Sequence, residues 1–398
     1  EFEGNEVVVK SNYSDTCGTT FANAVSIGGG SVWREVYETI GDDFHVVGGG
    51  CHSVSAAGGW LMGGGLSAMS RKYGFGIDNL LSMDVVLPNG TAAHVDACEN
   101  PDLFLAFRGG GGGTFGVVTK VHFKLHPVEP VVHLSMEITY EDLSSFGVLI
   151  YSFWQFWVRT SPTIPNNWGG YWTLNSLSLY HFGDISEADS LIDTVTVWAN
   201  DQNRNDLVTV SADDSFISYW DAVGRGSYTE QTGIDDMNIG ARLIPSSFVE
   251  AKANNEAVDL LEDVSGLGYY TFNYFLGGAT ESVDGSATAM HPAAREAIWQ
   301  VISGAEVDTT MEPLRNVAGS ASGYNHANRI EPDWRNAFWG NNYGRLLEIK
   351  QQVDPNSILN CWHCVGYVGD EAEYVADDDE SDGKQDLNNS VIPQSPPR

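Results

Sequence analysis

Residues 48–65 constrain this chain more than any other stretch, because nearly half of them are glycine. The glycines stand at 48–50, 58–59 and 63–65. Glycine lets the backbone approach a ligand closely and adopt positive φ, and bare N–H groups in such a loop can hold an anion. The run, with the single thiol of Cys51 inside it, predicts a loop pressed against a large flat cofactor and its phosphates. A flexible linker is the alternative, but apolar side chains such as Trp60 and Leu61 argue against it.

Length and charge limit the classes of protein. A chain of 398 residues predicts two domains or three, and 42% hydrophobic residues support a real core. No run of 18 apolar residues occurs, so no membrane span is expected. The net charge of −33 argues against nucleic acid and anionic membranes as partners, since both need a basic face.

The start of the chain and its sequons bear on localisation. Residues 1–4 contain neither an initiator Met nor a signal peptide, which favours a processed or truncated product. Sequons at Asn12, Asn89 and Asn388 favour a secreted, extracellular glycoprotein.

Five cysteines give an odd count, which leaves one thiol over in a secreted protein. We expect Cys51 to be that thiol and the other four to form one or two structural disulfides or to stay buried as thiols. Cys361 and Cys364 have redox or zinc spacing, but a tetrahedral zinc site needs four ligands and no second pair exists, so we predict no metal.

The order of predicted elements indicates an α+β fold. The sequence favours strands at 80–87, 91–95, 114–125, 132–139 and 269–275. Helices are predicted at 101–107, 146–158, 186–198, 292–302 and 334–350, the last interrupted near Gly340. No glycine fingerprint opens a helix after a strand, so a nucleotide must be held in another way than in dinucleotide folds.

Composition indicates where the chain divides. The prolines at 127 and 130 predict a boundary, and residues 131–315 predict an antiparallel sheet covered on one face by helices. Residues 369–398 are acidic and lose their aromatic residues after Tyr374, which predicts a disordered tail.

Three separated motifs resemble the berberine-bridge-enzyme-like oxidases of the vanillyl-alcohol-oxidase superfamily, which have a PCMH-type FAD-binding domain. The first runs from Gly48-Gly-Gly-Cys51 to Ile77-Asp78-Asn79, the second covers residues 100–118, and the third covers 331–350 with Asp354-Pro355. The Cys-Trp-His-Cys ending is similar to fungal members described as isoamyl alcohol oxidases.

The chain departs from the family in two places. Nothing in residues 1–45 resembles the family's N-terminal FAD subdomain, so the FAD-binding domain is expected to be partial. A separate N-terminal fragment of the same precursor is therefore a candidate partner. The family's catalytic carboxylate has no clear counterpart in residues 290–301.

The resemblance implies FAD as cofactor. It also implies that residues 1–130 form the FAD-binding domain, that residues 131–315 bind the substrate, and that a C-terminal segment at 316–368 returns to the first domain. Cys51 aligns with the cysteine that forms a thioether to flavin C6, and a buried structural thiol is the alternative. Val54 stands where the family controls oxygen access, and a small valine implies an oxidase. For Asp78 a turn or cap role is equally plausible. The residues predicted to bind the cofactor are Gly49, Gly50, Cys51, Val54, Gly58, Gly59, Gly63, Gly64, Gly65, Asp78, Asn79, Gly112, Gly113, Thr114, Phe115, Gly116, Val117, Asn325, Asn341 and Tyr343.

Oxidation of an alcohol needs a group that takes the hydroxyl proton as hydride leaves. Tyr324 and His326 are the candidates, with a surface or turn histidine as the alternative for His326. Tyr270, Tyr274 and Trp299 are candidates for the pocket wall, although strand aromatics are more often core.

Together these observations predict an FAD-dependent oxidase that moves hydride from an alcohol or similar small donor to flavin N5, with O2 as acceptor and H2O2 as product. A carbohydrate oxidase of the same family is one alternative. A truncated, non-catalytic remnant that acts only as a binding or structural protein is the other.

Overall fold

The computed structural model describes residues 4–139, 143–204, 206–223, 239–251, 256–265, 272–304, 314–316 and 319–369. The chain divides into two units, Glu1–Tyr367 and Val368–Arg398. The fold described below is that of the first unit. The predicted tail lies outside the described residues apart from Gly369.

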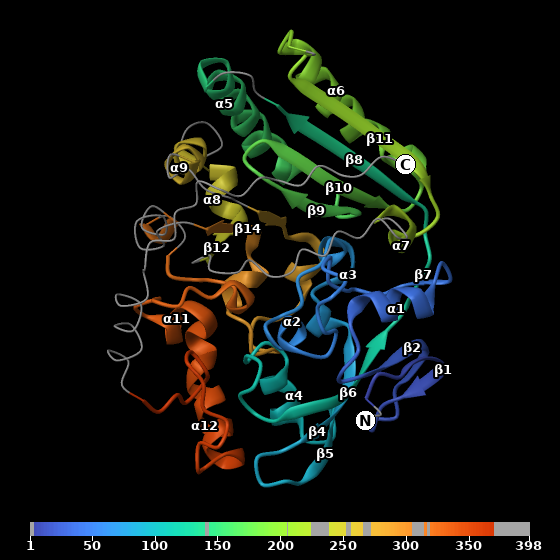
Figure 1. The fold of residues 1–398 in the computed structure, drawn as a ribbon, viewed down its shortest axis with the longest axis vertical. Helices are drawn as coiled ribbons and strands as arrows, with labels where there is room; N and C mark the ends of the chain where they lie inside the picture. Colours follow the sequence, from blue (N-terminus) through green and yellow to red (C-terminus); the bar gives the residue numbers. More distant parts are fainter. Residues whose placement is uncertain are drawn as a thin grey trace, which may run out of the picture. The chain divides into compact units, whose positions relative to one another are not determined.

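A five-stranded antiparallel sheet with the order β1-β2-β6-β4-β5 forms the first half of this unit (Figure 1). The predicted turn after residue 87 joins two of its strands, with Gly90 at φ 83° as the hairpin requires. The strands are β1 Val7–Ser14, β2 Thr20–Gly28, β4 Leu80–Val86, β5 Ala92–Val95 and β6 Val117–Lys124.

A seven-stranded antiparallel sheet with the order β11-β8-β10-β9-β13-β14-β12 forms the second half. The strands are β8 Val131–Ile138, β9 Trp168–Trp172, β10 Ser176–Phe182, β11 Val208–Phe216, β12 Ile239–Pro245, β13 Asn273–Phe275 and β14 Ala297–Gly304. A short pair, β3 Phe44–His45 with β7 His126–Pro127, lies at the junction of the two halves.

Side chains alternate between the two faces of the second sheet, as the period of a strand requires. Trp172 and Phe275 belong to a core beneath helices, while their neighbours Tyr171 and Tyr274 pack against the core of the first half. The helices on the first of these faces are α5 Leu143–Thr160, α6 Asp189–Asp201, α8 Ser246–Ala251 and α9 Glu256–Ser265 (Figure 1). The second sheet therefore faces the first half with a row of tyrosines.

The remaining helices with described bounds place side chains in or against the core of the first half. They are α1 Trp33–Ile40, α2 Gly59–Met62, α3 Ser70–Tyr73, α4 Pro101–Phe107, α7 Tyr219–Ala222, α11 Trp334–Trp339 and α12 Tyr343–Val353. The predicted interruption near Gly340 is confirmed, since that residue has φ 50° and separates α11 from α12. Helix α12 contacts α4 of the first half. No helix within the described ranges is long and apolar enough to span a membrane.

One predicted helix is wrong. Residues 292–302 were expected to be helical, but Pro292–Arg295 is a single 3₁₀ turn and Ala297–Gly304 is strand β14. The strand pairs with β12 and β13 on its two sides. Its β-branched and aromatic residues, among them Trp299 and Val301, favour a pleated surface over a helix. Burial within the sheet decided the structure of this stretch.

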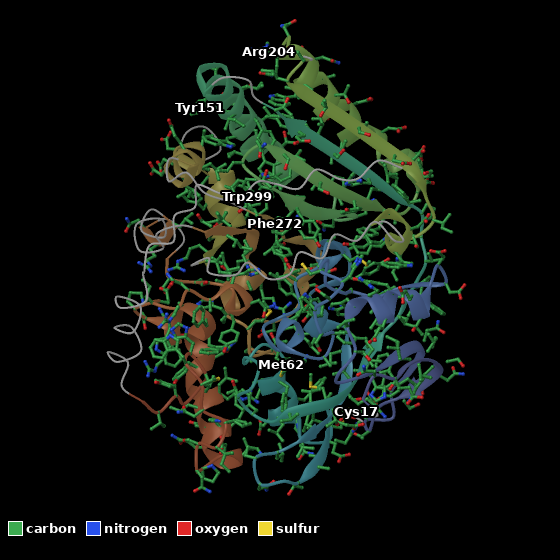
Figure 2. The ribbon with its side chains drawn as sticks, in the orientation of Figure 1. Cys17, Met62, Tyr151, Arg204, Phe272 and Trp299 are labelled. Carbon is green, nitrogen blue, oxygen red and sulfur yellow. A yellow bond between two sulfur atoms is a disulfide. The ribbon has the colours of Figure 1, made fainter. Side chains whose placement is uncertain are left out.

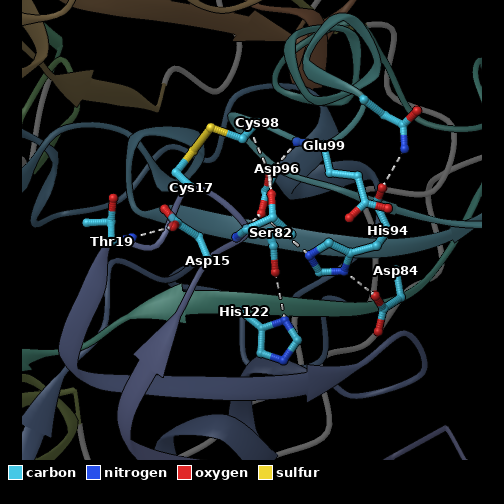
Figure 3. Close-up of polar contacts among 12 residues, drawn as sticks. Asp15, Cys17, Thr19, Ser82, Asp84, His94, Asp96, Cys98, Glu99 and His122 are labelled. Carbon is cyan, nitrogen blue, oxygen red and sulfur yellow. Dashed lines mark hydrogen bonds and ion pairs between the residues drawn. A yellow bond between two sulfur atoms is a disulfide. The ribbon is translucent and has the colours of Figure 1, made fainter.

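The disulfide predictions agree with the structure. Cys17 pairs with Cys98 and Cys361 with Cys364, and Cys51 is free. Figure 3 shows the first bridge beside Asp96, whose carboxylate accepts hydrogen bonds from Thr16 and from the backbone N–H groups of Cys98 and Glu99. Burial alone would raise the pKa of Asp96, but these hydrogen bonds outweigh it and lower the pKa to about 2. The loop that carries the bridge is thus fixed to the sheet.

Candidate functional site

A cavity of about 660 Å³ lies between the glycine-rich loops and the second sheet. Figure 2 labels Met62, which lines it, and Phe272, whose ring centroid is 5.0 Å from that of Tyr171. Ten residues predicted as site residues line it: Gly49, Gly50, Cys51, Val54, Gly59, Gly112, Gly113, Tyr324, Asn325 and His326. The other lining residues are Trp60, Met62, Leu66 and Tyr274.

We call Gly49, Gly50, Gly59, Gly112 and Gly113 the glycine wall. A Cβ added at Gly59 or Gly113 would meet nothing within 4 Å, so these two positions face open space. A Cβ at Gly49 would instead lie 3.0 Å from the ring of Trp33, and one at Gly50 would lie 2.7 Å from the Tyr171 hydroxyl. At Gly59 and Gly113 the missing side chain leaves room for a flat group, whereas at Gly49 and Gly50 it lets the backbone pack closely on Trp33 and Tyr171.

Gly63, Gly64 and Gly65 do not line the cavity, although they belong to the same run. A Cβ at Gly63 would lie 1.7 Å from the Asn325 side chain, and one at Gly65 would lie 2.8 Å from the Cα of Gly76. Gly64 and Gly65 have φ 125° and 78°. These glycines let segments of the protein approach one another, and Gly58, which packs on Ser55, is also outside the lining.

Cys51 and Val54 open into the cavity at the edge of the glycine wall. The Cys51 thiol is free, and partial burial raises its pKa, so it is protonated at neutral pH. Val54 is 36% exposed. Of the five cysteines, the one predicted to meet the cofactor is thus the one that reaches the cavity.

We call Tyr274, Tyr324, Asn325 and His326 the aromatic wall. The last three form a 3₁₀ turn, η6 Tyr324–His326, and Tyr274 comes from β13. Asn325 Nδ2 donates to the backbone oxygen of Trp60 at 2.9 Å, which joins the two walls. The Tyr324 ring lies 5.2 Å from that of Trp339, and burial raises its pKa to about 12.

His326 is the half-buried histidine of the aromatic wall. Its Nδ1 lies 2.9 Å from Nε2 of Gln300, and its ring centroid lies 5.9 Å from that of Tyr274. Burial lowers the pKa of His326 to about 4, so the ring is neutral around pH 7. Neutral imidazole can accept a proton, as a general base must.

Several predicted cofactor residues are committed to contacts inside the protein and lie outside the cavity lining. Asp78 pairs with the Arg295 guanidinium at 2.6 and 2.8 Å, and Asn79 bonds two backbone carbonyls and His126. Asp78 Oδ2 also accepts from the Phe75 backbone N–H at 2.9 Å, which is the turn or cap role that was the alternative for Asp78.

The second glycine motif and the C-terminal motif also contain predicted cofactor residues that lie outside the cavity lining. The carbonyl of Thr114 accepts from Lys350 Nζ at 2.7 Å, and Phe115 packs on Phe107. Gly116 packs on Val86 and Phe107, and Val117 is 59% exposed. None of these four lines the cavity.

In the C-terminal motif, Asn341 is exposed and Tyr343 packs on Trp334 and Trp339. Their neighbour Asn342 donates to the carbonyls of Gly285, Thr288 and Met290, a role that the sequence analysis missed. Its position in the motif was a usable signal.

The remaining aromatic candidates lie in different parts of the molecule. Tyr274 lines the cavity as predicted, whereas Trp299 belongs to the core under the helices, and Tyr270 lies outside the described residues. Trp60, Met62 and Leu66 were missed as lining residues, and of these Trp60 was named only as an apolar residue that argues against a linker. Among the described residues that line the cavity, none is Asp, Glu, Lys or Arg.

Comparisons with known proteins agree with this geometry. Residues 324–363 match the family model "Berberine and berberine like", and residues 18–96 match "FAD binding domain". The chain is 27% identical to the FAD-linked oxidoreductase OXR2 of Pyricularia oryzae, over 86% of this chain and 62% of that protein. It is 28% identical to the FAD-linked oxidoreductase ffsJ of Aspergillus flavipes, over 89% and 66%. The chain thus spans less than two thirds of the length of these relatives.

Solved structures share the fold. The VAO-type flavoprotein MtVAO713 from Myceliophthora thermophila superposes with a TM-score of 0.76 at 23% identity, over 91% of this chain and 71% of that one. A chitooligosaccharide oxidase superposes with a TM-score of 0.68 at 18% identity, over 90% and 80%.

The residues present fit a flavin. Open glycine positions at Gly59 and Gly113 leave room for a flat ring system, and the unpaired Cys51 thiol lies at its edge. The predicted resemblance is confirmed by the family-model matches, by FAD-linked relatives and by VAO-type structures. The chain therefore has the VAO-type, PCMH-type FAD-binding fold joined to an antiparallel sheet covered by helices, and its homologues are FAD-linked oxidoreductases.

Proposed function

We propose that this chain is the greater part of an FAD-linked oxidase that acts on an uncharged alcohol carrying an apolar body. One observation carries the proposal: a single cavity has backbone glycines that leave space for a flat ring on one wall and a neutral histidine on the other. When bound, FAD supplies a two-electron acceptor that takes hydride from the donor and passes the electrons to O2, which yields H2O2.

The chain's own residues would bind and orient these two groups. Cys51 lies where the resemblance predicts a thioether to the flavin, and Val54 lies beside it at the predicted point of oxygen access. His326 would take the hydroxyl proton of the donor, and Tyr324 would donate a hydrogen bond to the same oxygen, since burial keeps it protonated. Apolar groups such as Met62 and Leu66 would exclude water from the reacting atoms.

The polarity of the cavity favours an alcohol over a carbohydrate. The described lining holds no charged side chain, and Asn325 Nδ2 is already bonded to Trp60. On the aromatic wall, the Tyr324 hydroxyl and the second nitrogen of His326 can meet a ligand. A sugar ring with several hydroxyls would lose hydrogen bonds to water there without replacing them.

Comparison of donors tests this choice. The purified protein, reconstituted with FAD, would be mixed without oxygen with branched and aromatic alcohols and separately with cellobiose or chitooligosaccharides. We expect the alcohols to bleach the flavin and O2 to restore the colour with release of H2O2. Bleaching by the oligosaccharides alone would favour the carbohydrate oxidase. Protein that holds no FAD would favour a non-catalytic remnant.

We further propose a secreted protein in which residues 1–130 and 316–368 hold FAD and residues 131–315 bind the donor. Two disulfides and the exposed sequon residues Asn12 and Asn89 support secretion, while Asn388 lies outside the described residues. Asn89 Oδ1 accepts from the Thr91 backbone at 2.9 Å, in an exposed turn that a glycan could occupy. Mass loss on glycosidase treatment would test this, and no change would contradict it.

A separate N-terminal fragment that completes the FAD site remains a prediction. Pull-down from the native source with the tagged chain, followed by mass spectrometry, would detect one.

A further inference from the structure

We propose that Gln300 is a positioning residue that sets the tautomer of His326, and that rotation of its amide decides whether the histidine accepts or donates a proton. This inference rests on the proposed function, because it concerns the group assigned to the donor's hydroxyl proton. Nothing in the sequence motifs singles out Gln300, and it comes from the stretch that was expected to be a helix.

Gln300 lies directly behind His326. It is fully buried in β14, opposite Tyr274 of β13, and its Nε2 lies 2.9 Å from Nδ1 of His326. The amide packs closely against Gly323, where an added Cβ would lie 2.4 Å from Oε1 and 2.8 Å from Nε2. A strand and a glycine thus hold the amide beside the imidazole.

The two polar atoms of the Gln300 amide differ in their hydrogen bonds. Nε2 meets His326, whereas Oε1 is buried and has no hydrogen-bond partner among the described residues. With the NH2 group on Nδ1, a neutral ring carries its proton on Nε2 and can only donate there. A half turn of the amide exchanges two groups of nearly equal size, so that Oε1 accepts from Nδ1–H and Nε2 becomes free to accept.

The second orientation suits the proposed chemistry. The hydroxyl proton passes to Nε2, and the imidazolium that forms keeps its Nδ1–H on Oε1, which then has the partner it lacks. The titratable groups that share the cavity are Tyr274, Tyr324 and Cys51, and no charged group of the described lining competes with Gln300 for control of the ring. Burial lowers the pKa of His326, so the ring starts neutral.

The test uses the FAD-loaded protein with ¹⁵N-labelled histidine, with the His326 signal assigned by its loss in His326→Gln. In Gln300→Glu a carboxylate would hold Nδ1–H, so we expect that tautomer and a rise of the titration midpoint by about one pH unit or more. In Gln300→Leu we expect mixed tautomers. Gln202→Leu, a variant of a remote half-buried glutamine, should behave as wild type.

Kinetics give a second readout. Gln300→Leu should lower kcat by about tenfold or more with KM nearly unchanged, and Gln300→Glu should move the acidic limb of the pH profile upward with the NMR midpoint. An unchanged tautomer and midpoint in Gln300→Glu would overturn the inference. If Gln300→Glu does not fold, the test rests on Gln300→Leu. A histidine ¹⁵N spectrum of Gln300→Leu identical to that of the wild type would then overturn the inference. If no alcohol reduces the wild-type flavin, the proposed function fails, while the NMR experiment still decides the role of Gln300.

Discussion

The glycine wall and the aromatic wall enclose the same cavity but are built in opposite ways. In the glycine wall the backbone meets the ligand, and the missing side chains at Gly59 and Gly113 make the space. In the aromatic wall the ends of Tyr324 and His326 meet the ligand, and buried partners such as Trp339 and Gln300 hold them. The difference teaches that substitutions in the first wall should affect folding and cofactor retention, while those in the second should affect rate.

Replacement of His326 should give the largest effect and sharpen this contrast. His326→Gln keeps the volume and polarity but removes the base, so we expect kcat to fall by about 100- to 10,000-fold. The free energy of unfolding should change by less than about 1 kcal/mol. Stopped-flow flavin reduction and urea unfolding measure the two quantities. Near-normal reduction would exclude His326 as the base.

Acid should weaken the first half of the molecule before it protonates His326. Burial lowers the pKa of His45, His122 and His126 to about 4 in the folded protein, against about 6.5 when unfolded. The unfolded chain therefore binds more protons, and stability is lost as pH falls from about 6.5 to 4, by up to about 3 kcal/mol for each histidine. Urea unfolding at pH 7, 6 and 5 measures this loss. In His122→Asn the slope of the unfolding free energy against pH should fall by the equivalent of one proton. An unchanged slope would contradict the lowered pKa of His122.

Gly65→Ala should damage the fold rather than the chemistry. Its φ of 78° and the Cα of Gly76, which would lie 2.8 Å from the new Cβ, predict a loss of about 2–4 kcal/mol. Urea unfolding measures the loss, and Gly344→Ala, at an open helical position, is the control. Equal stability of the two variants would contradict the packing role of residues 63–65.

Gly59→Leu should weaken FAD binding and leave the fold intact, the opposite of Gly65→Ala. A Cβ at Gly59 would meet no protein atom within 4 Å, so we expect the free energy of unfolding to stay within about 0.5 kcal/mol of wild type. The same side chain would enter the space assigned to the flavin, and the Kd for FAD should rise about tenfold or more. Fluorescence titration of FAD measures the change. Normal FAD affinity in Gly59→Leu would contradict the claim that the glycine wall leaves space for the flavin.

Tyr324→Phe should have the smallest effect. Removal of one hydroxyl from an otherwise unchanged ring should lower kcat by about three- to tenfold, the value of one hydrogen bond. The ring contact with Trp339 should keep the wall in place. Initial rates of H2O2 release measure the change, and a loss as large as that of His326→Gln would make Tyr324 the base.

The two walls also differ in how far the sequence predicts them. The glycine wall follows from composition, because glycines among apolar residues predict backbone pressed on a flat group. Within that run, however, residues 63–65 pack on distant partners such as Asn325, Met290 and Gly76, which no local pattern reveals. Periodicity also predicted part of the secondary structure: each predicted strand overlaps a strand of the structure, and each predicted helix except 292–302 overlaps a helix, but β1, β2 and β9 to β12 were not predicted. It failed for β14, where burial on both sides of the sheet overrides the local pattern.

The aromatic wall depends on contacts between segments far apart in the chain. Tyr324 and His326 were found by their place next to a motif, not by their partners. Gln300 and Trp60 gave no signal, because their roles arise only when β14 and α2 meet η6. Asp78 and Asn79 show the opposite failure. They were predicted as cofactor residues because they belong to a motif, but they bind Arg295 and His126 and do not line the cavity.

Mass spectrometry of the reconstituted and denatured protein tests the central claim most directly. The wild-type chain should retain the visible absorbance of oxidised flavin through precipitation and carry the added mass of one FAD, while Cys51→Ser should bind FAD and release it on denaturation. Wild-type protein that takes up no FAD, although it is folded, would contradict the account.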